Sequence, residues 1–382
     1  MFSPAESDAL HARVQAFIRA SLDTEPAETF DALALSIARY QAAHVPAIAR
    51  LVKARRASLD GATDASAIPA VPTDVFRLAR VAAHPPELDV AVFKTSGTSQ
   101  GKAARGEHPL RTTATYELGA LSWAEELLFP DRTMLAWPLR CIVLAPEAGE
   151  QPESSLGFML DLFTRHLEGP ASFHVRLADD GSATIDREGF LRAAHEAREA
   201  REPALVLATS FALVHLLDDL AGVEIALPPG SRVMQTGGFK GRSREVPAAE
   251  LRAQVSKAFG VPESHVVAEY GMTELSSQLY ESTLVAALLR RPKVPHGFYA
   301  APPWVRVVPV DPETLLPVPA GEVGIARVVD LANVDSAVAI QTADRVRLVS
   351  QGGEERVELL GRAPGAPPRG CSIAIDEMLG GA

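Results

Sequence analysis

Two short segments of the chain contain the residue types that a nucleotide site needs. In the first, Thr95-Ser96-Gly97-Thr98-Ser99, small hydroxyl residues surround a glycine. Backbone N–H groups and hydroxyls of such a loop can converge on phosphate oxygens. Only three residues separate Gly97 from Gly101, and Ala103 stands where the metal-binding Ser or Thr of a P-loop would follow Lys102. This spacing excludes a P-loop kinase or GTPase, and it leaves another kind of phosphate loop or a plain surface turn.

The second segment is Tyr270-Gly271-Met272-Thr273-Glu274, directly after an expected strand from His265 to Ala268. Ligands of an open α/β sheet usually bind beyond the carboxyl ends of its strands. Tyr270 can present its ring to a purine, Thr273 a hydroxyl to a phosphate, and Glu274 a carboxylate to Mg²⁺. The alternatives are a core aromatic at Tyr270 and a charge at a helix N-terminus at Glu274.

Three further pieces are weaker by themselves. Gly237-Gly238 follows a short apolar run and permits close approach of the backbone to a flat ligand. Asp344 could accept two ribose hydroxyls, and Arg362 closes the run Leu360-Gly361-Arg362. Taken alone, the glycine pair and Asp344 are equally compatible with plain turns. The residues expected to line a substrate pocket are Thr209, Ser210, Phe211, Phe239 and Lys240.

Composition limits the class of protein. The 382 residues and 47% hydrophobic content allow one large core or two domains. A net charge of −11 disfavours a nucleic-acid partner, which needs a basic face. No apolar run approaches the roughly 18 residues that cross a bilayer, and no secretory signal is visible. Cys141 and Cys371 cannot form a disulfide framework, so we expect a cytoplasmic protein without membrane insertion.

The elements that must position these residues fall into an α/β pattern. A capping box at Ser3 and Glu6 opens a first helix, and a second helix is expected from about Asp31 to Arg56. Short apolar runs then alternate with helical stretches, which predicts a mostly parallel sheet flanked by helices. From Trp304 onward the pattern changes to short strands joined by Pro, Gly and Asp turns.

These patterns divide the chain into four expected parts. They are an N-terminal helical layer over residues 1–75, an α/β core over 76–300, a β-rich subdomain over 301–361, and a Pro/Gly-rich tether with Cys371 over 362–382.

The order and spacing of the motifs resemble the adenylate-forming superfamily of acyl-CoA synthetases, luciferases and adenylation domains. The resemblance implies ATP and Mg²⁺ as cofactors, with adenine on Tyr270, the α-phosphate at Thr273 and Mg²⁺ at Glu274. It also implies ribose hydroxyls at Asp344, with Arg362 near the ribose and phosphate. The phosphate loop departs from the family at Gln100, where Gly is usual, so no role is assigned to Lys102.

Only twenty residues follow Arg362, where most of the superfamily has about a hundred that form a mobile lid. We therefore expect the adenylation core without that lid domain. The chain is similar to the short acyl-protein synthetases of the LuxE type, through Gly237-Gly238-Phe239-Lys240-Gly241-Arg242 and Arg369-Gly370-Cys371-Ser372. This resemblance implies that Cys371 accepts the acyl group as a thioester. The charge of Arg369 could favour the thiolate.

The leading hypothesis has two half-reactions. A carboxylate, a fatty acid by family resemblance, attacks the α-phosphorus of MgATP and gives acyl-AMP and pyrophosphate. Cys371 then takes the acyl group and passes it to a protein such as a fatty-acyl reductase. One alternative is direct transfer from acyl-AMP to coenzyme A, an amine or a carrier protein. Another is a catalytically inactive protein that binds ATP or acyl-adenylate.

Overall fold

The structure, a computed structural model, describes residues 2–95, 105–134, 138–178, 182–237, 246–363 and 369–379, without the side chain of Arg369. Contacts divide the chain into two compact units. The first comprises Met1–Ser122, Met272–Gln278 and Tyr299–Ala382, and the second comprises Trp123–Gly271 and Leu279–Phe298. The units do not follow the boundaries expected at residues 75, 300 and 361, because the N-terminal helices share a unit with the C-terminal strands.

The second unit contains the mostly parallel sheet that the sequence predicts. Five parallel strands lie in the order β5 (Ala171–Phe173), β4 (Arg140–Leu144), β8 (Ala204–Thr209), β9 (Arg232–Thr236) and β10 (Val266–Tyr270), and β11 (Leu279–Glu281) pairs antiparallel with β10. The other elements are η3 (Arg132–Met134), α6 (Ser155–Leu167), the hairpin of β6 (Val175–Leu177) and β7 (Ala183–Ile185), α7 (Arg187–Ala200), α8 (Ser210–Leu220), α9 (Ala248–Phe259), η4 (Glu263–His265) and α10 (Thr283–Leu288).

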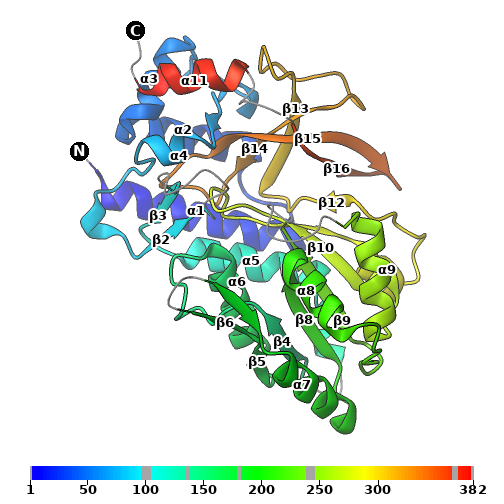
Figure 1. Cartoon of the computed structure of the whole chain (residues 1–382). Helices are drawn as coiled ribbons and strands as arrows, with labels where there is room; N and C mark the ends of the chain where they lie inside the picture. Colours follow the sequence, from blue (N-terminus) through cyan, green and yellow to red (C-terminus); the bar gives the residue numbers. More distant parts are fainter. Residues whose placement is uncertain are drawn as a thin grey trace. The chain divides into compact units, whose positions relative to one another are not determined.

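One face of this sheet packs against α7, α8 and α9 (Figure 1). Val206, Val233 and Val266 lie in register on neighbouring strands, and each is completely buried in this core. Strands of a parallel sheet that are covered on both faces consist of continuous apolar residues rather than an alternating pattern. This explains the short apolar runs that the sequence shows between its helical stretches.

The first unit contains the expected β-rich part as an antiparallel sheet. Its strands are β13 (Val305–Val310), β14 (Gly324–Asp330), β15 (Ala339–Gln351) and β16 (Glu354–Arg362), with β1 (Val71–Pro72) parallel to β15. A separate hairpin pairs β2 (Ala91–Lys94) with β3 (Glu107–Leu110). A boundary between the units falls within two elements, α5 (Ala114–Leu127) and β12 (Phe298–Ala300).

The N-terminal helices begin where the sequence predicts, but the second one is shorter. Helix α1 (Pro4–Asp23) starts after Ser3, whose hydroxyl accepts from the Glu6 N–H at 3.4 Å. The single helix expected from Asp31 to Arg56 is wrong, because Val45 is extended and separates α2 (Phe30–His44) from α3 (Pro46–Ala54). Pro46 has no N–H and disfavours helical backbone at the residue before it. The short elements η1 (Ala65–Ala67), α4 (Val75–Leu78) and η2 (Pro86–Leu88) follow.

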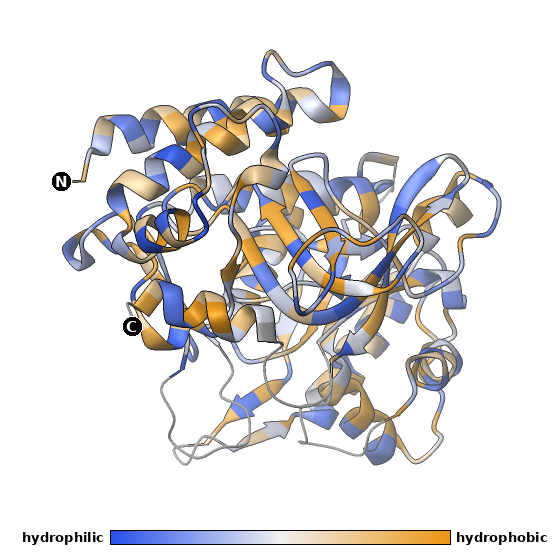
Figure 2. Cartoon of the chain, turned by 90° about the horizontal axis from the view of Figure 1, so that it is seen from above, coloured by the Kyte–Doolittle hydropathy of each residue, from blue (hydrophilic) through white to orange (hydrophobic). Residues whose placement is uncertain are grey.

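The end of the chain differs from the expected tether. Residues Arg369–Leu379 form helix α11, which packs on α3 and β1, while 364–368 lie outside the described residues. Its buried residues Cys371, Ala374 and Met378 are spaced to share one face, and Figure 2 shows the mixed hydropathy of this helix. Arg50 Nε donates to the Met378 carbonyl at 2.5 Å. Within the described ranges, no helix is long and apolar enough to cross a membrane.

A buried carboxylate attaches the N-terminal helices to the rest of the first unit. Asp335 Oδ1 accepts from the Ser7 hydroxyl at 2.6 Å and from the Tyr40 hydroxyl at 2.8 Å. Its Oδ2 lies 3.0 Å from His11 Nε2 and 3.3 Å from Arg111 Nε. Burial alone would raise the pKa of Asp335, but hydrogen bonds and the nearby His11 hold it well below its ordinary value. The charge of Asp335 is therefore fully paired.

Removing this charge should destabilise the protein strongly. We expect Asp335→Asn to lower the free energy of unfolding by about 3 kcal/mol, because its buried hydrogen-bond donors lose their charged acceptor and Arg111 keeps only the exposed Asp8. Urea denaturation at neutral pH measures the change. The control is Asp8→Asn, which removes a carboxylate that is 64% exposed and pairs with the same Arg111. It should cost less than about 1 kcal/mol. Equal, small losses for both variants would contradict this role of Asp335.

Candidate functional site

Three parallel strands of the second unit end at the same level. Thr236 at the end of β9 is the Cα partner of Thr209 on β8 and of Glu269 on β10. Gly237 directly follows Thr236, and Tyr270 directly follows Glu269. The structure therefore brings the predicted residues Thr209, Gly237 and Tyr270 to one edge of the sheet. This is the edge at which open α/β sheets bind ligands.

Two of the expected pocket residues use their hydroxyls within the fold. Thr209 Oγ1 accepts from the Ala212 N–H at 3.1 Å and caps α8, and Ser210 Oγ donates to the Thr236 carbonyl at 3.5 Å. The Phe211 ring stands edge-on to His215, with 4.5 Å between the ring centroids. The predicted Gly238, Phe239 and Lys240 lie outside the described residues. Their place at a substrate pocket stays a prediction.

The sequence interpretation missed Glu269, the residue before Tyr270. Its carboxyl group is buried and accepts a hydrogen bond from the Thr236 hydroxyl. Burial raises the pKa of Glu269 to about 7, although the Thr236 hydrogen bond acts in the opposite direction. A titratable group near neutrality thus stands at the end of the sheet. A signal was present in the sequence, because Glu269 is the one acidic residue in the otherwise apolar run Val266–Tyr270.

In the first unit, Thr95 closes the base of the predicted phosphate loop. Its N–H donates to the Gly106 carbonyl at 2.9 Å, and its hydroxyl accepts from the Gly106 N–H at 2.9 Å. These bonds continue the β2–β3 pairing by one residue. Of the predicted loop, Ser96, Gly97, Thr98 and Ser99 lie outside the described residues, as does Lys102. The structure therefore gives the anchor of the loop and not its phosphate contacts.

Side chains from distant parts of the first unit hold the backbone of Thr273 and Glu274. His108 Nδ1 lies 2.7 Å from the Thr273 carbonyl, and Asn333 Nδ2 donates to the Glu274 carbonyl at 2.9 Å. Burial lowers the pKa of His108 to about 4, so the ring is neutral. Because a carbonyl only accepts, Nδ1 carries the ring hydrogen. His108 and Asn333 were not predicted from the sequence, since each acts through a contact far along the chain.

The same segment is held further by a buried aspartate. Asp330 Oδ2 accepts from the Ser276 N–H at 2.9 Å, and Asp330 Oδ1 accepts from the Ser277 hydroxyl at 2.8 Å. Asn333 Oδ1 accepts from the Ser276 hydroxyl at 2.6 Å. Residues 273–277 are thus fixed by side chains, although they belong to no helix or strand.

The predicted ribose residues Asp344 and Arg362 are brought together. They are Cα partners across β15 and β16, next to a register shift between Asp344 and Val346. Asp344 is half-buried and its N–H donates to Thr342 Oγ1 at 3.0 Å, whereas Arg362 is exposed. Opposite charges at directly facing positions of antiparallel strands favour the pairing.

Cys371 is inaccessible in this structure. It lies in the first turn of α11, is 4% exposed, and packs with Val310 and Ile325. Burial, with a smaller effect of Asp74, raises the pKa of the thiol to about 11. The thiol is therefore protonated in the docked helix, whereas the expected effect of Arg369 stays a prediction, because its side chain lies outside the described residues.

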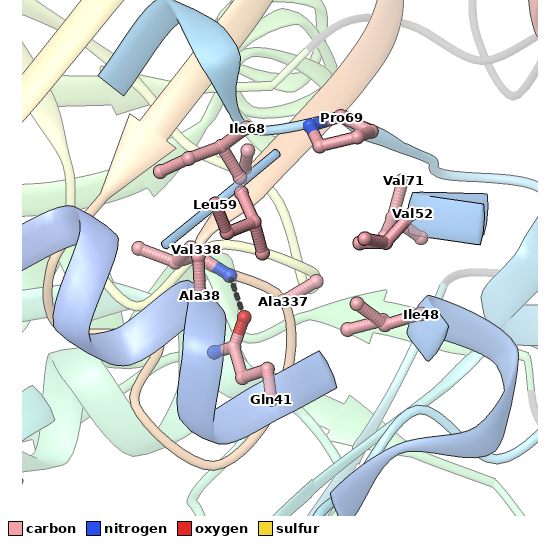
Figure 3. A pocket seen from close by; sticks show the side chains of 11 residues that line it. Ala38, Gln41, Ile48, Val52, Leu59, Ile68, Pro69, Val71, Ala337 and Val338 are labelled. Carbon is pink, nitrogen blue, oxygen red and sulfur yellow. Dashed lines mark hydrogen bonds between the residues drawn. The ribbon is translucent and has the colours of Figure 1, made fainter. Parts of the chain in front are cut away.

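One apolar hollow of the first unit is lined by α2, α3 and the segment around β1 (Figure 3). Ile48, Val52 and Val71 line it, together with Gln41. The Gln41 amide is fully used, since Nε2 donates to the Asn333 and Val334 carbonyls and Oε1 accepts from the Val338 N–H. This hollow presents no polar group for recognition, and we assign it to packing.

Comparison with known proteins identifies a family profile and a shared fold. The profile "Acyl-protein synthetase, LuxE" matches residues 53–380. The chain is similar to ATP-bound MatB from Rhodopseudomonas palustris, with a TM-score of 0.50 and 17% identity over 72% of this chain and 48% of that chain. It therefore spans about half the length of MatB.

The structure is also similar to 2-hydroxyisobutyryl-CoA ligase. In the open conformation with 2-HIB-AMP and CoA, the TM-score is 0.60 and the identity 12%, over 94% of this chain and 71% of that chain. In the postadenylation state with the ligand R3-HIB-AMP, the TM-score is again 0.60 and the identity 12%. The comparison with curated protein sequences finds no match. These similarities confirm the predicted fold, that of the adenylate-forming ligases.

The buried Glu269 should make stability depend on pH. Its pKa rises from an ordinary 4.5 to about 7 in the folded chain, so the folded protein keeps a proton that the unfolded chain releases. Its contribution to stability is therefore complete below about pH 4.5 and is lost as the pH rises through about 7. We expect Glu269→Gln, which stays neutral, to exceed the wild type by roughly 1–3 kcal/mol at pH 8 and to match it at pH 4.

Urea denaturation at several pH values between 4 and 8 measures this difference. The exposed Glu263→Gln, in the same unit, is the matched control and should show no such pH-dependent gain. A constant difference between Glu269→Gln and the wild type across the range would show that the pKa of Glu269 is the same in the folded and the unfolded chain, and would contradict the raised value.

Proposed function

Because the chain belongs to the acyl-protein synthetase (LuxE) family, we propose that it activates a carboxylic acid with ATP and transfers the acyl group to Cys371. The observation that carries this proposal is the extent of the family match, which includes the Tyr270–Glu274 segment and Cys371. The similar structures agree in kind, since MatB is bound to ATP and 2-hydroxyisobutyryl-CoA ligase to 2-HIB-AMP. A fatty acid is the first candidate substrate, and a fatty-acyl reductase the first candidate acceptor.

In this proposal, the adenine ring stacks on Tyr270 at the carboxyl end of β10. Asp344 accepts the ribose hydroxyls and Arg362 lies near the phosphates. Thr95 and the loop that it anchors bind the terminal phosphates, and Thr273 binds the α-phosphate. The hydrogen bonds of His108 and Asn333 to the carbonyls of 273 and 274 support this role, because they fix the backbone that presents both side chains.

Glu274 is the proposed ligand of Mg²⁺. The ion commonly binds through one or two protein carboxylates and the phosphates of its substrate, so a single acidic residue fits this chemistry. Among the described residues, no group of three or more His, Cys, Asp or Glu side chains could hold a metal without a substrate. When bound, Mg²⁺ would reduce the repulsion between the phosphates and the attacking carboxylate.

The first half-reaction needs no general base. An ordinary carboxylic acid has a pKa near 4 and is already ionised at neutral pH. Its oxygen attacks the α-phosphorus of ATP, the bond to the β-phosphate oxygen breaks, and pyrophosphate leaves. The product is acyl-AMP, a mixed anhydride. Hydrogen-bond donors directed at the phosphate oxygens would stabilise the charge that develops.

The second half-reaction requires a thiolate at Cys371. Its sulfur attacks the acyl carbonyl, the bond between that carbon and the phosphate oxygen breaks, and AMP leaves with the electron pair. A thiol with a pKa of about 11 is ionised to only about one part in ten thousand at pH 7. Transfer therefore requires the start of α11 to leave its position against Val310 and Ile325.

The same burial favours one alternative. If Cys371 stayed docked, acyl-AMP would have to react directly with coenzyme A, an amine or a carrier protein. A single variant separates the two routes, because direct transfer does not involve the Cys371 sulfur.

Intact-protein mass after incubation with ATP, Mg²⁺ and a panel of acids tests the proposal. We expect the wild type to gain one acyl group that hydroxylamine removes. Cys371→Ser should still catalyse ATP–pyrophosphate exchange at a rate near that of the wild type, because acyl-AMP formation does not use the thiol. It should show no hydroxylamine-sensitive gain in mass.

The matched control is Cys141→Ala, which removes the other cysteine, a buried strand residue. It should keep the mass gain. Full product formation by Cys371→Ser would establish direct transfer instead. Binding of ATP without pyrophosphate exchange for any acid would identify a nucleotide-binding protein without the activity.

A further inference from the structure

Gln235 has a buried amide oxygen to which none of the described residues donates a hydrogen bond. It lies on β9, one residue before the strand ends, and is 5% exposed. Its amide oxygen Oε1 has no hydrogen-bond partner among the described residues. A buried amide oxygen without a donor is rare in folded proteins and calls for a missing partner. Thr236, the next residue, has its partner in Glu269.

The neighbours of Gln235 on the sheet are small. Its Cα partners are Ala208 on β8 and Ala268 on β10. Side chains in register on parallel strands point to the same face, so a methyl group lies on each side of the amide. A longer residue at either position would cover it.

Tyr270 belongs to the same face. It follows Ala268 by two residues within β10, and side chains two residues apart in a strand point to the same side. Strand geometry places the Cα atoms of Gln235 and Tyr270 about 8 Å apart, one strand spacing across and two residues along. Beyond Gln235 on its own strand comes Gly237, with φ +69°, where an added Cβ would meet no described atom within 4 Å.

We infer that Gln235 recognises the base of the nucleotide, its Oε1 accepting a hydrogen bond from the 6-amino group of an adenine that stacks on Tyr270. The inference rests on the proposed use of ATP and adds the residue that selects the purine. A 6-oxo purine presents an acceptor at the same place, so it would face the amide oxygen unfavourably. An amide that rotated freely could present its NH2 group to a 6-oxo purine and would bind both bases. The ratio of the affinities for ATP and inosine triphosphate is therefore the decisive quantity.

Calorimetric binding of ATP and of inosine triphosphate, with Mg²⁺ and without any acid, tests the inference on the full chain. We expect the wild type to bind ATP roughly ten-fold more tightly than inosine triphosphate. Gln235→Leu, which keeps a similar volume without the acceptor, should weaken ATP binding about five-fold and strengthen inosine triphosphate binding about two-fold, because the opposed acceptor is gone. The ratio of affinities should approach one.

The control is Val233→Ala, a change two residues earlier on the same strand face. It removes core volume, so it should lower the melting temperature while leaving the affinity ratio at its wild-type value. If Gln235 had only a structural role, Gln235→Leu would likewise lower the melting temperature and leave the affinity ratio at its wild-type value. If that variant does not fold, Gln235→Met provides the same comparison with an unbranched side chain.

The outcomes separate this inference from the function on which it rests. ATP binding by the wild type with no preference over inosine triphosphate, or with a preference that Gln235→Leu retains, overturns the inference and leaves the proposed function intact. A wild-type protein that binds neither nucleotide overturns both.

Discussion

The register of the parallel strands β8, β9 and β10 determines what the candidate site can contain. Because the strands end together, residues from three distant parts of the sequence reach one edge of the sheet. A slip by one residue would turn every side chain of a strand to the opposite face. Gln235 and Tyr270 would then lie on different faces, and Glu269 would lose Thr236. The continuous apolar core beneath, with Val206, Val233 and Val266 in line, fixes this register.

The first unit fixes its part of the site in another way. Residues 273–277 have no strand partner, so side chains must satisfy their backbone groups. Asp330 is completely buried, and burial raises its pKa to about 6 despite its hydrogen bonds with Ser277 and the backbone. Such a group is costly unless every partner is in place. The cost favours one arrangement of the segment over its alternatives.

The sequence predicted those features that depend on neighbours along the chain. The alternation of strands and helices, the Ser3 cap, the β-rich part and a strand leading to Tyr270 were all visible as local patterns, although that strand, expected to end at Ala268, continues to Tyr270. The break between α2 and α3 at Pro46 also has a local cause. It was missed because apolar residues continue at helical spacing on both sides of it. His108, Asn333 and Asp330 could not be recognised, because their partners are far away in the sequence and nothing in their spacing indicates a pairing.

The end of the chain shows a limit of another kind. Pro and Gly at 364–368 predicted a tether, but the residues after them place Cys371, Ala374 and Met378 on one face of a helix, and that face is buried. The linker itself lies outside the described residues, and its composition obscured the short amphipathic repeat that follows. The apolar residues of α11 recur every three or four positions, but the helix has only 11 residues. So short a repeat cannot be distinguished from chance unless the surface that it packs against is known.

The packing around Cys371 bears on the order of events in the proposed reaction. Gly370 has no room for even one more carbon, since an added Cβ would lie 2.7 Å from the Leu315 side chain and 3.0 Å from the Glu313 carbonyl. Closely packed interiors do not accept extra volume without displacement of their neighbours. An acyl chain on the Cys371 sulfur therefore could not return to this position. Under the proposed function, the free thiol is buried, neutral and protected, whereas the thioester keeps the start of α11 away from Val310 and Ile325. Acylation itself would then distinguish the loaded enzyme from the empty one, and an acceptor protein could recognise the exposed helix as well as the acyl group.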